Sequence, residues 1–280
     1  FIIENNGYGL STPSSEQFRM KSFTDKAIGY GIEAVQIAGN NILEVYNNLA
    51  KLADSVRENP RPILVECMTF RMRGHEEASG TKYVPKALMD HWALRDPLSN
   101  YERFLLEEGL LTEASKKELT AKWKKHIEAG LQHAFEEGDP QNELAEELAD
   151  VYAPYVPQLT TPKTEQKSDK RFVDALSDGL RQAMEKHDKL ILMGQDIADY
   201  GGVFKITDGF VAQFGKERVR NTPLCESAIV GAGLGMALEG NKTVMEMQFA
   251  DFVTVGFNQI INNLAKIHYR WGQNADMVIR

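Results

Sequence analysis

Cysteine, long apolar runs and basic clusters are all scarce in this sequence. Cys67 and Cys225 are the only two cysteines, and neither belongs to a spacing typical of metal or redox sites. Because each lies in an apolar segment, we expect two buried, free thiols in a reducing compartment, which we take to be the cytoplasm. No apolar run is long enough to span a membrane and no signal peptide is recognisable, so no membrane association is expected.

The charge balance argues against a further class of protein. The 280 residues carry a net charge of −8 and show no basic stripe with interleaved aromatic residues, so we expect no binding to nucleic acid. A hydrophobic content of 42% is typical of globular proteins, and the length suffices for two domains or one large domain. The chain begins at Phe1 within an apolar run, and we expect it to be part of a longer protein.

Strands and helices are predicted to alternate in the first half of the chain. The expected elements are the end of a buried strand at 1–3, a strand at 32–39, a helix at 42–57 and a buried strand at 63–70. This alternation predicts a parallel sheet covered by helices on both faces. Polar loops at 4–13 and 71–85 follow two of the strands, so they should meet at the ligand-binding edge of the sheet.

The middle of the chain changes character twice. Residues 86–150 are predicted to form surface helices, because apolar residues recur at four-residue spacing among acids and lysines. Residues 153–170 carry three prolines and many small polar residues, which is typical of a linker. We therefore expect one domain with a helical extension over 1–152, a linker over 153–170 and a second domain over 171–280.

A second α/β unit is predicted after this linker. Its expected elements are helices at 172–187, 210–215 and 253–269, and strands at 190–194, 243–249 and 277–280. Within it, Glu226 precedes a run rich in glycine and alanine, which predicts a helix that another backbone or a ligand can approach closely. An acid among apolar residues is costly unless it is paired or used in chemistry, but it could also stabilise a helix N-terminus. Position alone leaves both roles for Glu226 open.

Two loops carry groups that could bind a metal or an anion. Asn6 lies in an oxygen-rich loop of the kind that suits magnesium, although Asn-Asn-Gly is also a common turn. Arg71, Arg73 and His75 could hold an anion, although solvated loops often have the same composition. The glycines of residues 231–235 lack the spacing of a dinucleotide-binding fingerprint, so we exclude that type of site.

Taken together, these segments resemble a known family. IIENNGYGLSTPSSEQF resembles the second half of the thiamine-diphosphate motif in the α subunit of 2-oxo acid dehydrogenases, and TFRMRGH resembles that subunit's Thr-Tyr-Arg-x-x-Gly-His loop. GQDIADYGGVFKITDGF, FGKERVRNTPLCESAIVGAGLGMAL and EMQFADF resemble the N-terminal domain of the β subunit. The match covers nearly the whole chain in the family's order, which implies a fused decarboxylating component built from two thiamine-diphosphate-binding-type α/β domains. The segments TPLCE and QFADF resemble branched-chain 2-oxo acid dehydrogenases more closely than the pyruvate enzyme.

The resemblance assigns roles to residues of the first two loops. It implies that Asn6 and the backbone carbonyl of Tyr8 ligate magnesium, and that Leu10 props the bent thiamine diphosphate. Arg71 matches an arginine that binds the diphosphate. His75 matches a catalytic histidine near the diphosphate and the reacting carbon.

In the second half, the resemblance makes Glu226 the catalytic glutamate that hydrogen-bonds the aminopyrimidine ring. Leu224, Gln248 and Phe252 match residues that line the cofactor pocket. The implied activity is oxidative decarboxylation of a branched-chain 2-oxo acid through a thiamine diphosphate ylid, of the 3-methyl-2-oxobutanoate dehydrogenase type. The acyl group would pass to a lipoyl-bearing dihydrolipoyl acyltransferase core, and the fused chains would associate into an α2β2-like dimer.

Alternatives and departures accompany this resemblance. The chain could be the pyruvate or acetoin version of the same component, or a non-catalytic fragment that only assembles with partners. The Gly-Asp-Gly half of the metal motif would lie before Phe1, and the family's β-domain histidine would lie beyond 277–280. We therefore expect this chain alone to lack a complete active site. Glu76 stands where mitochondrial members carry a phosphorylatable serine, so kinase control at this position is not expected.

Overall fold

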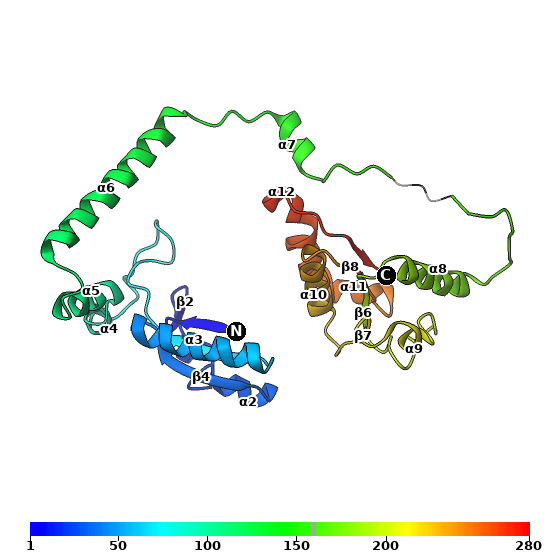
Figure 1. Cartoon of the computed structure of the whole chain (residues 1–280), viewed down its shortest axis with the longest axis horizontal. Coiled ribbons are helices and arrows are strands. Elements are labelled where there is room, and N and C mark those ends of the chain that lie inside the picture. The colour runs from blue at the N-terminus through cyan, green and yellow to red at the C-terminus, as the bar shows by residue number, and fades with distance from the viewer. Residues whose placement is uncertain (158, 160) are drawn as a thin grey trace. The chain divides into compact units, whose positions relative to one another are not determined.

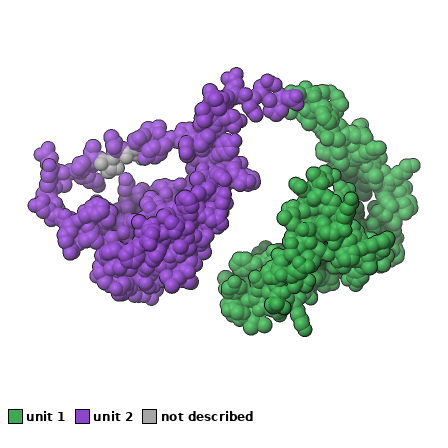
Figure 2. All heavy atoms as spheres, turned by 180° about the vertical axis from the view of Figure 1, so that it is seen from behind, with its two compact units in different colours: residues 1–138 green, residues 139–280 purple. Residues whose placement is uncertain are grey.

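The structure, a computed structural model, describes residues 1–157, 159 and 161–280. It divides into two compact units, Phe1–Gly138 and Asp139–Arg280 (Figure 2), and each is described by itself. Residues 158 and 160 of the predicted linker lie outside the described residues, and the described part of 153–170 contains no helix or strand. No helix in the described part of the chain combines the length and the apolar character needed to cross a membrane.

The first unit is built on a three-stranded parallel sheet of order β1-β5-β4. Its edge strand β4 is labelled in Figure 1. Its strands are β1 (Ile2–Asn5), β4 (Glu33–Ala38) and β5 (Ile63–Met68). The prediction of a buried central strand is confirmed, since the first five residues of β5 are buried. The prediction of a buried strand at 1–3 is wrong for this chain, because β1 lies at the edge of the sheet and leaves Ile2 58% exposed.

Helix α3 (Ile42–Glu58) covers one face of this sheet, as its apolar periodicity predicts. The helix begins after Asn41, whose side chain accepts a hydrogen bond from the Glu44 amide. Apolar side chains of α3 pack against Ile37, Ile63, Val65 and Cys67 of the sheet; they are Val45, Leu49, Leu52 and Val56. Because side chains alternate along a strand, Glu66 faces the opposite side of β5.

Short elements follow β1, and a series of helices follows β5. The short elements are β2 (Tyr8–Gly9), β3 (Thr12–Pro13), α1 (Ser14–Gln17) and α2 (Asp25–Tyr30). The helices are α4 (Lys86–Ala93), α5 (Pro97–Glu107) and α6 (Glu113–Glu136), and α7 (Leu144–Asp150) belongs to the second unit. The helical character predicted for 86–150 is confirmed. The apolar stripe of α6 stays about half exposed in this chain, as the 56% exposure of Trp123 illustrates.

The second unit contains a four-stranded parallel sheet of order β7-β6-β8-β9. The strands are β6 (Leu190–Gly194), β7 (Val219–Asn221), β8 (Lys242–Met245) and β9 (Met277–Ile279). Helices α8 (Phe172–Lys186) and α9 (Phe210–Phe214) contribute to one apolar core with the sheet. Helices α10 (Glu226–Leu238) and α11 (Val253–Asn262) contribute to a second core. The prediction of a parallel sheet flanked by helices is thus confirmed.

Three expectations for the second unit need correction. The strand expected over 243–249 ends at Met245, and the helix expected over 253–269 is interrupted. Helix α11 ends at Asn262 and is followed by a 3₁₀ turn (Leu264–Lys266) and α12 (Ile267–Trp271). The break falls at two consecutive asparagines, which have low helix propensity. Cys225 is half-buried because it precedes α10 at the edge of the sheet, whereas Cys67 is buried as expected.

Candidate functional site

A tight turn at the carboxyl end of β1 shapes the predicted metal-binding loop. The side-chain oxygen of Asn5 accepts a hydrogen bond from the Gly7 amide at 2.9 Å, and that of Asn6 accepts one from the Tyr8 amide at 2.9 Å. Gly7 has a φ of 77°, which glycine adopts without strain. The amide of Ser14 donates to the Gly7 carbonyl at 2.8 Å, which ties the turn to the start of α1. Local side-chain-to-backbone bonds therefore determine where the oxygens of residues 5–8 lie.

Arg71, which follows β5, lies beside this turn. Its Nη2 donates to the Leu10 carbonyl at 2.8 Å and lies 3.1 Å from the Tyr83 hydroxyl. A narrow cavity of about 10 Å³ lies here; it is lined by Asn6, Tyr8, Phe70, Arg71, Tyr83 and Val84. The structure thus brings together three predicted residues, Asn6, Tyr8 and Arg71. Tyr83 was not predicted, and its only sequence signal was its place in the polar loop 71–85.

Leu10 adopts a backbone conformation that leucine rarely accepts. Its φ is 57°, and left-handed conformations cost an L-residue roughly 1–2 kcal/mol. The bond from Arg71 to its carbonyl holds it in place, while its side chain is 57% exposed. Such strain is often found at functional sites, which agrees with the role predicted for Leu10 without testing it.

The structure does not place His75 in the cavity that Asn6, Tyr8 and Arg71 line. It is exposed, and it makes no hydrogen bond to any other residue that the structure describes. The chain turns back on itself here. A Cβ on Gly74 would overlap the Ser79 carbonyl, and the Glu76 amide donates to the Ser79 hydroxyl at 3.0 Å. The expected position of His75 near a diphosphate therefore stays a prediction.

The groups around Asn6 fit a diphosphate and part of a magnesium shell. Arg71 has no carboxylate partner within the described residues, so its guanidinium can form charge-assisted bonds to an anion. The Asn6 amide oxygen and the Tyr8 carbonyl are oxygen donors of the kind that magnesium accepts. Over residues 1–157, 159 and 161–280, no group of three or more His, Cys, Asp or Glu residues could hold a metal ion. A metal here would thus depend on ligands additional to these two.

Glu226 occupies the first position of α10 in the second unit. Its side chain is half-buried and has no hydrogen-bond or ion-pair partner among the residues described. The close helix packing that the small residues predict is present between α10 and α11. A Cβ on Gly256 would lie 3.1 Å from Val230 and 3.4 Å from the Glu226 carbonyl, and one on Gly231 would lie 3.5 Å from the Gln259 side chain.

The other three predicted residues of this unit follow strands β7 and β8 at their carboxyl ends. Leu224 is 82% exposed, and Phe252 packs edge-on against Phe249 with ring centroids 5.6 Å apart. The Gln248 amide donates to the Asp196 carboxylate at 3.2 Å. Asp196 follows β6 and was not predicted, although it stands in the motif GQDIADYGG and its φ of 57° marks an unusual turn. These groups lie at the sheet edge where ligands bind in such folds.

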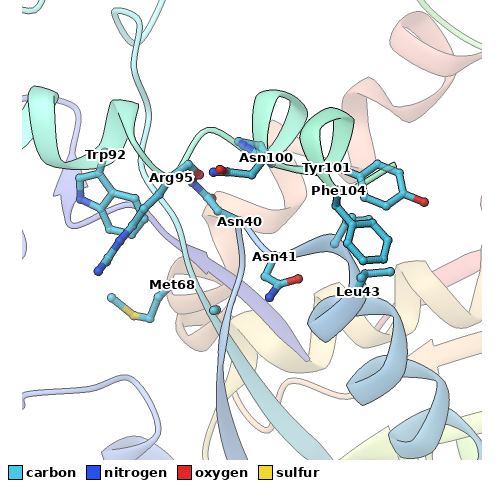
Figure 3. Close-up of a pocket in the computed structure, with 12 residues that line it drawn as sticks. Asn40, Asn41, Leu43, Met68, Trp92, Arg95, Asn100, Tyr101 and Phe104 are labelled. Atoms are coloured by element: carbon cyan, nitrogen blue, oxygen red, sulfur yellow. Dashed lines mark hydrogen bonds between the residues drawn. The ribbon is translucent and has the colours of Figure 1, made fainter. Parts of the chain in front are cut away.

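A larger pocket in the first unit was not predicted (Figure 3). It has a volume of about 530 Å³ and lies between the ends of β4 and β5, the start of α3, and helices α4 and α5. Trp92 in its wall stacks on Phe70 with a centroid distance of 5.7 Å, and the Arg95 guanidinium lies 5.6 Å from the Trp92 ring. None of the predicted site residues lines this pocket. Its walls come from elements far apart in the sequence, so no local motif could reveal it.

The two parts of the chain match two different protein families. Residues 1–143, about half of the chain, match the family described as "Dehydrogenase E1 component". The chain belongs to this family. Residues 169–279 match the family described as "Transketolase, pyrimidine binding domain", which confirms the predicted thiamine-diphosphate-binding α/β type. The resemblance to 2-oxo acid dehydrogenases is likewise confirmed.

Several curated relatives match between about a third and three fifths of this chain. The β subunit of 2-oxoisovalerate dehydrogenase from Bacillus subtilis is 48% identical over 99 residues, which are 35% of this chain and 30% of that protein. The α subunit of 3-methyl-2-oxobutanoate dehydrogenase from Mycobacterium tuberculosis is 31% identical over 170 residues, which are 60% of this chain and 46% of that protein. The β subunit of the pyruvate dehydrogenase E1 component from Leifsonia xyli is 43% identical over 108 residues, 39% of this chain and 32% of that protein. The chain thus spans about a third to a half of the length of these relatives.

Proposed function

We propose that this chain is part of a fused decarboxylating component of a branched-chain 2-oxo acid dehydrogenase complex that uses thiamine diphosphate and magnesium. One observation carries the proposal: a dehydrogenase E1 match and a pyrimidine-binding-domain match follow one another in a single chain. The groups expected for each part are present, with Asn6, Tyr8 and Arg71 gathered in the first unit and a carboxylate without a partner among the described residues, Glu226, in the second.

In the first unit, the residues would bind and orient the phosphate end of the cofactor. Asn6 and the Tyr8 carbonyl would supply two magnesium ligands, and Arg71 would donate to diphosphate oxygens. Arg71 can do so because its present acceptors are two neutral carbonyls, of Leu10 and Arg73, and the Tyr83 hydroxyl. The exposed Leu10 side chain would support the bent shape of the cofactor.

In the second unit, Glu226 would hold a proton at the aminopyrimidine ring nitrogen. Thiamine diphosphate, when bound, supplies a carbon nucleophile and an electron sink for loss of carbon dioxide. Leu224 and Phe252 would exclude water from the reacting centre, and Gln248 would orient the ring from the same sheet edge. His75 would move protons during transfer of the acyl group to a lipoyl arm.

A branched-chain substrate is favoured by the names of two relatives, a 2-oxoisovalerate and a 3-methyl-2-oxobutanoate dehydrogenase subunit. The pyruvate version is the second candidate, because a pyruvate dehydrogenase β subunit also matches. Steady-state rates of the complete protein on 2-oxoisovalerate and pyruvate, with an artificial electron acceptor, distinguish them. A pocket shaped for a branched chain should favour 2-oxoisovalerate in kcat/KM by at least about tenfold. A preference for pyruvate would assign the second function.

A third possibility is an assembly fragment without catalysis. Thiamine diphosphate titration of the complete protein with magnesium tests it, because this possibility requires that no cofactor binds.

We further propose a cytoplasmic protein that docks on a lipoyl-bearing dihydrolipoyl acyltransferase core. Its fused chains would pair into an α2β2-like dimer, and sedimentation of the complete protein as monomer alone at micromolar concentration would contradict that pairing.

A further inference from the structure

Glu66 is a fully buried carboxylate at the centre of the first sheet, and none of the roles proposed above uses it. It has 0% exposure and accepts hydrogen bonds from three side chains. Asn5 Nδ2 donates to one carboxylate oxygen at 2.7 Å, and Gln36 Nε2 donates to the other at 2.9 Å. The Ser22 hydroxyl is the third donor, and the Phe23 backbone amide also favours the charged form. Burial raises the pKa of Glu66, but these donors together hold that pKa below its ordinary value, so the group is ionised at neutral pH.

The donors of Glu66 come from three different segments. Gln36 lies directly opposite Glu66 on the neighbouring strand β4, and Asn5 is the last residue of β1 on the other side. Ser22 and Phe23 belong to the segment before α2. Among the described residues that bond to Glu66, only Asn5 connects it to the turn that carries Asn6 and Tyr8, whereas Ser22 and Gln36 belong to other parts of the unit.

The charge of Glu66 decides which way the Asn5 amide faces. A carboxylate only accepts hydrogen bonds, so the Asn5 NH₂ group must point toward Glu66. The Asn5 carbonyl oxygen must then point the other way, where it accepts from the Gly7 amide at 2.9 Å. A side chain at position 66 that also donated would allow the amide to rotate and would remove the acceptor from Gly7.

We propose that Glu66 is a positioning residue that acts through Asn5 on the Asn6–Tyr8 turn. By orienting the Asn5 amide, it holds the turn in the shape that presents the Asn6 side-chain oxygen and the Tyr8 carbonyl. The proposal rests on the proposed function in so far as these oxygens are magnesium ligands. The alternative is a purely structural role, in which Glu66 holds Ser22 and Gln36 by hydrogen bonds. It would then stabilise the unit without affecting the Asn6–Tyr8 turn.

Two substitutions separate these roles. Glu66→Gln keeps the shape but adds a donor that competes for the orientation of Asn5, whereas Ser22→Ala removes one donor to Glu66 and leaves the Asn5 bond in place. Asn5→Ala removes the link itself and serves if Glu66→Gln fails to fold. All variants are made in the complete protein.

The first measurement is hydrogen–deuterium exchange of peptides covering residues 4–10, without cofactor. We expect Glu66→Gln and Asn5→Ala to speed exchange there by at least about tenfold, and Ser22→Ala to change it by less than about twofold. Exchange that stays at the level of the unmutated protein in Glu66→Gln and Asn5→Ala overturns the proposal. This result does not depend on cofactor binding, so it also decides the proposal if the proposed function fails.

The second measurement is magnesium titration at saturating thiamine diphosphate. Glu66→Gln and Asn5→Ala should each raise the half-saturating magnesium concentration about tenfold, and the double variant should be no worse than either alone, because both act through one link. Ser22→Ala should keep the magnesium affinity even where it lowers Tm. The link through Asn5 would be overturned if the double variant raised the half-saturating magnesium concentration by the product of the two single effects. It would also be overturned if Ser22→Ala and Glu66→Gln lowered the magnesium affinity equally. Failure of the unmutated protein to bind magnesium and cofactor would instead refute the proposed function.

Discussion

Replacing Glu226 by glutamine tests the chemical role proposed for the second unit. The substitution keeps the shape of the side chain and removes its charge and its acid function. Glu226 is the first residue of α10, where an acid stabilises a helix by about 0.3–1 kcal/mol. Because no cation pairs with it among the described residues, no larger electrostatic loss is expected. At about 2–4 °C per kcal/mol for a unit of this size, Tm should fall by at most about 4 °C.

The chemical effect should be far larger than this loss of stability. A positioned acid–base group contributes about a hundred- to ten-thousand-fold to proton transfer, so proton exchange at the thiazolium carbon of bound thiamine diphosphate should slow by that factor. Quenched-flow exchange in deuterium oxide, followed by NMR of the released cofactor, measures it.

Glu239→Gln is the matched control, because it removes the same charge from the exposed position that follows α10. That variant should exchange at the rate of the unmutated protein and should melt no lower, since an acid is unfavourable at a helix C-terminus. If Glu226→Gln binds the cofactor and its thiazolium proton exchanges at the normal rate, Glu226 only stabilises the helix. The proposed mechanism would then have no group that activates the cofactor.

Three further predictions concern the first unit. Asn6→Ala in the complete protein should weaken magnesium-dependent cofactor binding by about tenfold or more, since it removes one of two proposed oxygen ligands; unchanged affinity in calorimetry would exclude Asn6 as a ligand. Leu10→Gly should stabilise the cofactor-free protein in urea by up to about 1 kcal/mol, because glycine accepts a φ of 57° without strain; a loss of stability would contradict this account of the strain. The pKa of Glu66 is lower in the folded chain than its ordinary value of 4.5, so its ionised form stabilises the fold fully above that pH, and this stabilisation disappears as the pH falls through the lower, folded pKa. Glu66→Gln should therefore reduce the acid sensitivity of unfolding below about pH 4.5, and unfolding curves with the same pH dependence in both proteins would show that Glu66 does not contribute.

Much of the local structure could be predicted from sequence patterns. The apolar periodicity of 42–57 and the apolar run of 63–70 predicted α3 and β5, and the small residues after Glu226 predicted a helix that another backbone or a ligand can approach closely. These features depend on residues within a few positions of one another, so the sequence alone determines them. The same is true of the family, because its motifs are short and occur in a fixed order.

Contacts between segments far apart in the sequence decided the features that sequence patterns did not predict. Glu66 could only be read as one polar residue in an apolar strand, because its partners Asn5, Ser22 and Gln36 lie 61, 44 and 30 positions away. The exposure of β1 follows from its place at the sheet edge, and the pocket beside Trp92 follows from the meeting of separate elements. The sequence by itself determined which groups the chain carries and on which elements they stand. Only the tertiary structure decided which of them are buried and bonded together, because burial and hydrogen bonding depend on segments that the sequence separates by tens of residues.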